Sequence, residues 1–83
     1  MAQRVICEVQ WIKLGRVAKK LFFMEDKIGF TIYEQDLIPD RWRPVGHADE
    51  WRQVFFMSFP QRNLARACFI GRQAIAGYEE GNV

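Results

Sequence analysis

The stretch SFPQRNLARACFIGRQAIAGY, residues 58–78, decides the fold, because a start signal, a helical period and a stop signal agree within it. Ser58 and Gln61 have the spacing of a capping box, in which each side chain binds a backbone amide at a helix start. Pro60 suits a first helical turn, where its missing amide proton costs no hydrogen bond. Gly77 can adopt the left-handed conformation that ends helices, as can Gly81 just beyond the stretch. Together these signals predict a helix.

Apolar residues recur along this helix at helical spacing. Steps of four, three, four and three residues give one stripe made of Leu64, Cys68, Gly71, Ile75 and Tyr78. The stripe is widened by Ala65, Phe69 and Ala76, whereas polar residues lie off it. The pattern therefore predicts that this stripe is buried against the rest of the chain.

Four strands are expected upstream of the helix. Residues 4–12 alternate between apolar and polar side chains, as in a strand with one buried face. Residues 17–24 and 28–34 surround a short polar connection and predict a β-hairpin, although a helix remains open for 17–24. The aromatic content of residues 50–59 favours a strand, with Trp51, Phe55, Met57 and Phe59 on one side. A helix starting at Asp49 is the alternative for this last segment.

The order of these elements predicts an α+β fold. Four antiparallel strands in ββββα order would form one sheet, and the C-terminal helix would pack on one of its faces. A chain of 83 residues has the size of one domain, so residues 1–83 are expected to form a single unit. A turn with Gly15 would join the first two strands, and residues 34–48 would form a long loop of the kind that often carries function.

Cysteine content and hydropathy indicate the compartment. Cys7 and Cys68 are expected on buried apolar faces, and two cysteines are too few for the disulfide framework of a small secreted domain. The first residues lack the apolar run of a signal peptide, and no apolar run is long enough to cross a bilayer. We therefore predict a cytoplasmic protein without membrane contact.

The sequence offers no arrangement for catalysis. His47 is the only histidine, and Ser58, the only serine, is interpreted as the helix cap. His47, Asp49 and Glu50 lie together without the spacing typical of metal ligands. No glycine-rich phosphate loop occurs either. These observations predict a protein that is not an enzyme and uses no metal, cofactor or small-molecule substrate.

Adjacent aromatic residues indicate a second apolar face of the sheet. Phe22 and Phe23 are neighbours, as are Phe55 and Phe56, and neighbouring side chains of a strand lie on opposite faces. One helix covers only one face, so one ring of each pair would be exposed on the other. An exposed apolar patch of this kind usually marks a partner surface.

A second candidate contact lies in the long loop. Trp42 is flanked by two arginines, and tryptophan and arginine are the types that dominate protein–protein hot spots. Whether Trp42 contacts a partner or completes the core stays open. We therefore predict a small protein-binding module, of inhibitor or adaptor type, that occludes another protein or a second copy of itself. Its expected contact residues are Arg41, Trp42, Arg43, Trp51, Arg52, Phe22 and Phe56.

Basic residues suggest an alternative function in nucleic-acid binding. An outer sheet face with Lys20, Phe22 and Tyr33 would resemble an aromatic and basic platform. Basic stretches at 1–24 and 51–78 are separated by an acidic stretch, and the net charge of +2 is low for a dedicated nucleic-acid domain. The residues expected to contact nucleic acid are Lys19, Lys20, Arg62 and Arg66.

Overall fold

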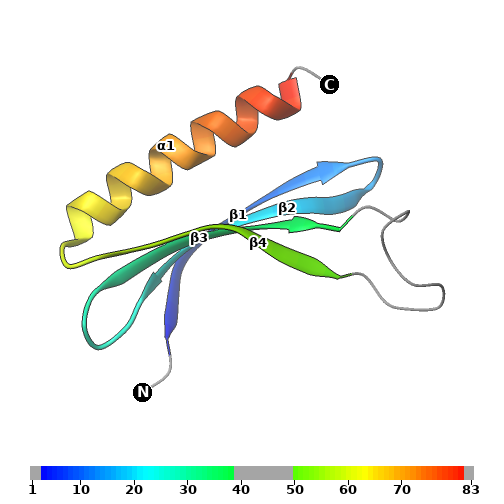
Figure 1. The fold of residues 1–83 in the computed structure, drawn as a ribbon. Coiled ribbons are helices and arrows are strands. Elements are labelled where there is room, and N and C mark those ends of the chain that lie inside the picture. Colours follow the sequence, from blue (N-terminus) through cyan, green and yellow to red (C-terminus); the bar gives the residue numbers. More distant parts are fainter. Residues whose placement is uncertain (1–2, 39–49, 82–83) are drawn as a thin grey trace.

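The described residues form one antiparallel sheet and one helix. A computed structural model describes the backbone of residues 3–38 and 50–81 and the side chains of these residues up to Ala76. The elements are β1 (Arg4–Lys13), β2 (Arg16–Glu25), β3 (Phe30–Leu37), β4 (Trp51–Phe59) and α1 (Arg62–Gly81). The strands lie in the order β1-β2-β3-β4 (Figure 1). The predicted ββββα fold is therefore confirmed, and residues 17–24 and 51–59 lie in strands rather than helices.

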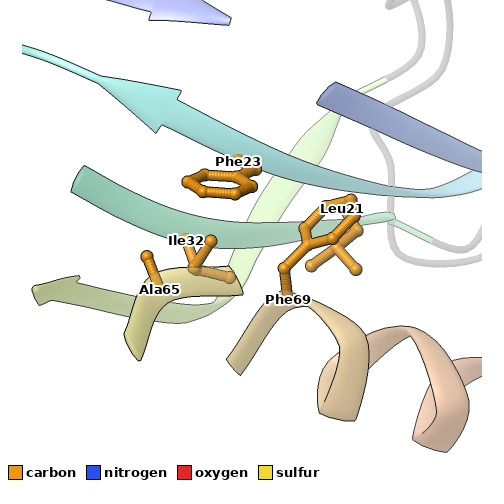
Figure 2. Close-up of a cluster of buried hydrophobic side chains, with 5 residues drawn as sticks. All are labelled: Leu21, Phe23, Ile32, Ala65 and Phe69. Atoms are coloured by element: carbon orange, nitrogen blue, oxygen red, sulfur yellow. The ribbon is translucent and has the colours of Figure 1, made fainter. Parts of the chain in front are cut away.

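The helix α1 lies across one face of the sheet (Figure 1), where it packs mainly on β2, β3 and β4. The core between the two layers contains five buried side chains, shown in Figure 2: Leu21, Phe23, Ile32, Ala65 and Phe69. The ring centroids of Phe23 and Phe69 are 5.7 Å apart. Side chains at alternate positions of β2 and β3 thus form the sheet surface against which α1 packs.

The predicted capping box does not form. The helix begins at Arg62, and the amide of Ala65 donates to the carbonyl of Gln61 over 3.2 Å. Ser58 instead belongs to β4, where its hydroxyl lies 3.4 Å from that of Thr31 on β3. The strand ladder extends to Phe59, and proline at position 60 has no amide proton to continue it. Ser58 is therefore a strand residue, and the prediction of a cap was wrong.

The buried face of α1 is also rotated from the predicted stripe. Ala65, Phe69 and Ala76 are 0%, 6% and 1% exposed, whereas Leu64 and Ile75 are 47% and 50% exposed. The residues expected only to widen the stripe are thus its centre, and Cys68 lies half-buried at its edge. Steps of four, three and four residues from Ala65 include the half-buried Arg72. The buried stripe includes the charged Arg72, so the spacing of apolar residues alone placed the stripe on a neighbouring side of the helix.

The expectation for the cysteines was wrong for Cys7. This residue is exposed, whereas Cys68 is half-buried. Cys7 lies on β1, the edge strand that α1 leaves largely uncovered. Burial raises the pKa of the Cys68 thiol above its ordinary value, and the nearby Arg72 guanidinium partly offsets this increase.

The turn between β1 and β2 forms as predicted. Lys13 pairs with Arg16, so the loop has two residues, Leu14 and Gly15. Their φ angles are 54° and 80°, as a type I′ hairpin turn requires. Leu14 is a branched residue in a left-handed conformation and is 97% exposed, so no packing compensates for its strain.

Leu14→Asn is expected to stabilise the protein by about 0.5–1 kcal/mol. The left-handed conformation costs an ordinary L-residue roughly 1–2 kcal/mol, and asparagine adopts it more readily. The free energy of unfolding from urea denaturation measures the gain. Leu14→Ala is the matched control and should give no comparable gain, because alanine lacks the short polar side chain whose local hydrogen bonds favour the left-handed conformation. Equal stabilisation by both variants would contradict the explanation.

Candidate functional site

Three aromatic residues form a row across the sheet. Phe22 on β2 is paired with Tyr33 on β3, and Tyr33 is paired with Phe56 on β4. Their neighbours Phe23 and Ile32 point into the core beneath α1, so the row lies on the opposite face, which we call the open face. The rings of Phe22 and Tyr33 stack with centroids 4.7 Å apart, and Phe56 is 54% exposed.

Along the strands, the open face is less uniformly apolar on both sides of this row. At one end of the open face, the Lys20 ammonium lies 4.5 Å from the centre of the Trp51 ring. Toward the other end, Met24 and Thr31 are buried within the inner strands, and Val5 on β1 is 49% exposed. None of the described helices and strands covers this face. The open face therefore has an aromatic centre and a mixed border.

A β-bulge determines which residues of β4 reach the open face. Phe55 is paired with Glu34 but Gln53 with Gln35, so β4 contains an extra residue at Val54. An extra residue reverses the alternation of the side chains before it. Trp51, paired with Leu37, thus lies on the open face and not with Phe55 as predicted.

The predicted contact residues are only partly brought together. Phe22, Phe56 and Trp51 share the open face, whereas Arg52 is paired with Asp36 and lies on the helix side. Arg41, Trp42 and Arg43 lie outside the described residues, so their role stays a prediction. Tyr33, which connects the two phenylalanines, was not among the predicted protein-contact residues. Only the pairing of β3 with β2 and β4 shows that Tyr33 lies between Phe22 and Phe56, and this pairing cannot be derived from residue types alone.

The basic residues of the nucleic-acid alternative lie on different surfaces. Lys19 is on the helix side, where its ammonium lies 3.3 Å from Glu34 and 3.5 Å from Asp36. Lys20 is on the open face, and Arg62 and Arg66 are on α1. The described structure does not bring these four residues into one surface.

A buried ion-pair network lies on the helix side of the sheet. Glu34 is 2% exposed, and its Oε1 accepts a hydrogen bond from Arg72 Nε over 3.0 Å and forms an ion pair with Arg72 Nη2 at 2.9 Å. The Arg72 guanidinium also lies 4.2 Å from the centre of the Phe55 ring. Lys19 pairs with the second Glu34 oxygen. This network joins α1 to β2 and β3 and is therefore part of the scaffold.

The described part of the chain contains no group of three or more histidine, cysteine, aspartate or glutamate side chains placed to hold a metal ion. None of its helices has the length and apolar content needed to cross a membrane. Comparison of the chain with protein-family models, with curated proteins and with solved structures found no significant match. The fold defines the chain as a small α+β domain, and its function must be argued from its surfaces.

Proposed function

We propose that this chain is a small non-catalytic protein-binding module, of inhibitor or adaptor type, that acts in the cytoplasm. It binds another protein or a second copy of itself through the open face and occludes the partner sterically. The observation that supports this proposal is the row of Phe22, Tyr33 and Phe56, aligned across three strands on a face that the helix does not cover. Residues 41–43 are proposed as further contacts on the basis of the sequence alone.

The energetics of this row fit a contact surface. An aromatic side chain can bury roughly 150–250 Å², so covering the exposed half of Phe56 removes about 100 Å² from water. At about 25 cal/mol per Å², this contributes on the order of 2–3 kcal/mol. Phe22 and Tyr33 are half-buried and already stacked, so little side-chain freedom is lost when a partner covers them. A preordered aromatic centre with a mixed border is typical of protein interfaces.

Phe56→Glu is expected to weaken partner binding at least about 30-fold, because it replaces about 2 kcal/mol of apolar contact with a carboxylate that must be desolvated. Sedimentation equilibrium measures the effect on self-association. Capture from a native extract, with the wild type and the variant as parallel baits, measures the effect on other partners. Thermal unfolding should change little, since the replaced ring is half-exposed.

Ile28→Glu is the matched control for this experiment. Ile28 is 90% exposed but lies in the connection between β2 and β3 rather than on the open face. The same apolar-to-acidic change there should leave both self-association and capture intact. If Phe56→Glu and Ile28→Glu behave alike in both assays, the open face is not the binding surface and the proposal is wrong.

A salt titration distinguishes this proposal from nucleic-acid binding. Contacts to about six phosphates would make affinity fall roughly 10³-fold between about 50 and 200 mM salt, whereas apolar association responds little. The separation of Lys19 from Lys20 and from the arginines of α1 gives the nucleic-acid alternative less support than the aromatic row gives to protein binding.

A further inference from the structure

A cavity of about 320 Å³ lies between α1 and β1. It exists because α1 packs mainly on the other three strands, so the helix side of β1 is left largely uncovered. Its apolar wall consists of Ile6, Phe23, Phe69 and Ile70. This volume is at the lower end of the range of small-ligand sites, roughly 300–1,000 Å³. The cavity is separate from the open face, which lies on the other side of the sheet.

Two arginines give this cavity its charge. Arg62 and Arg66 line it from α1, four residues apart and so on the same side of the helix. The Arg62 guanidinium carbon lies 6.0 Å from the centre of the Phe23 ring, which places positive charge directly beside the apolar wall. None of the lining residues is acidic.

Both guanidinium groups are available to an anion. Neither Arg62 nor Arg66 forms an ion pair with a carboxylate of the described residues. Glu25, two residues beyond Phe23 on β2, is paired with Arg4 instead. Arginine binds carboxylates through parallel N–H donors, and an anion next to an apolar wall is less screened than one in bulk water. The charge complementarity therefore selects a ligand with an anionic head and an apolar body.

We propose that this cavity binds a small amphipathic anion, namely a carboxylate with an unbranched alkyl chain of medium length. The carboxylate lies between Arg62 and Arg66, and the alkyl chain lies along Ile6, Phe23 and Phe69. Gln73 also lines the cavity, about two helical turns beyond Arg66 on α1. This site is independent of the proposed protein-binding function and stands or falls separately from it.

The experiment uses decanoate as the probe, below the concentration at which it forms micelles, with the full chain labelled for NMR. Decanoate is expected to shift the backbone amides of Ile6, Cys7 and Ile70 saturably and to leave that of Phe56 unchanged. Decanol, which lacks the charge, should bind at least about tenfold more weakly, and acetate, which lacks the chain, should not bind measurably. Cys7 is exposed and lines the cavity, so decanoate should also slow its alkylation in a Cys68→Ala background.

Substitutions identify the residues responsible. Arg62→Gln and Arg66→Gln should each weaken decanoate binding about tenfold, and Ile70→Glu should abolish it by placing a like charge at the cavity. Arg52→Gln on β4 is the matched control and should have no effect. All four side chains are exposed, so the variants should remain folded.

Three results would overturn the proposal. The first is shifts that do not saturate or that centre on the open face, and the second is decanol binding as tightly as decanoate. The third is that a peptide of leucine and glutamate residues shifts the amides of Ile6, Cys7 and Ile70 whereas decanoate does not. That result would assign the cavity to a protein partner. Loss of binding by Phe56→Glu with decanoate binding intact would show that the two surfaces act separately.

Discussion

Glu34→Ala is expected to destabilise the fold by about 3–5 kcal/mol, a large part of the roughly 5–15 kcal/mol that stabilises a domain. Glu34 is 2% exposed and pairs with both Arg72 and Lys19. Its removal leaves the half-buried Arg72 guanidinium and the largely buried Lys19 ammonium at the helix–sheet interface without the carboxylate that neutralises them, and leaving such charges unpaired costs more than the pairs contribute. The free energy of unfolding from urea denaturation, followed by circular dichroism, measures the loss.

Two controls separate burial from simple loss of charge. Glu8→Ala removes an exposed carboxylate of β1 that accepts a hydrogen bond from Gln10 over 2.7 Å, and it should cost less than about 1 kcal/mol. The double variant Glu34→Leu with Arg72→Met replaces the principal pair by apolar groups and should recover most of the stability lost by Glu34→Ala. Equal effects of Glu34→Ala and Glu8→Ala would show that the network does not support the helix.

Local patterns were sufficient to predict the elements. Alternation in residues 4–12, the polar connection after residues 17–24 and the aromatic content of residues 50–59 each correspond to an observed strand. These signals report which side chains of one segment share a face, and that requires no knowledge of other segments. The presence of aromatic rings on both faces of the sheet also followed from local information, because adjacent side chains of a strand point to opposite sides.

Features that depend on contacts between distant segments could not be predicted in this way. Arg72 was not part of the predicted stripe, yet it is half-buried because it pairs with Glu34, 38 residues earlier in the sequence. Ser58 was read as a cap because its partner Thr31 is 27 residues away. Trp51 changed faces because of a bulge that appears only in the register of β3 and β4. In each case a long-range partner overrode the local signal.

The position of one helix on four strands accounts for both proposed binding surfaces. Placed over β2, β3 and β4, α1 covers Leu21 and Ile32 but cannot also cover β1 or the opposite face. The helix side of β1 borders the cavity beside Arg62 and Arg66, and the opposite face of the sheet carries the aromatic row. Both surfaces thus depend on the rotation of α1 about its axis and on its position over the sheet.

Phe69→Ala is expected to destabilise the fold by about 3–5 kcal/mol and to loosen α1 from the sheet. Phe69 is 6% exposed and packs against Phe23 from the centre of the buried stripe. Replacing a buried phenylalanine with alanine removes its transfer free energy and leaves a cavity that the two rigid layers fill only partly. Urea denaturation gives the free energy, and hydrogen exchange of the α1 amides shows whether the helix detaches before the sheet unfolds.

Leu64→Ala tests whether the rotation of α1 is as observed. Leu64 is on the same helix, one turn before Cys68, but it is 47% exposed. Its replacement should cost less than about 1 kcal/mol, partly offset by the higher helix propensity of alanine. If the helix instead packed through the stripe that apolar periodicity indicates, Leu64→Ala would be the more damaging of the two substitutions. The ratio of the two losses therefore distinguishes the two orientations of α1 directly, since both variants end in alanine on the same helix.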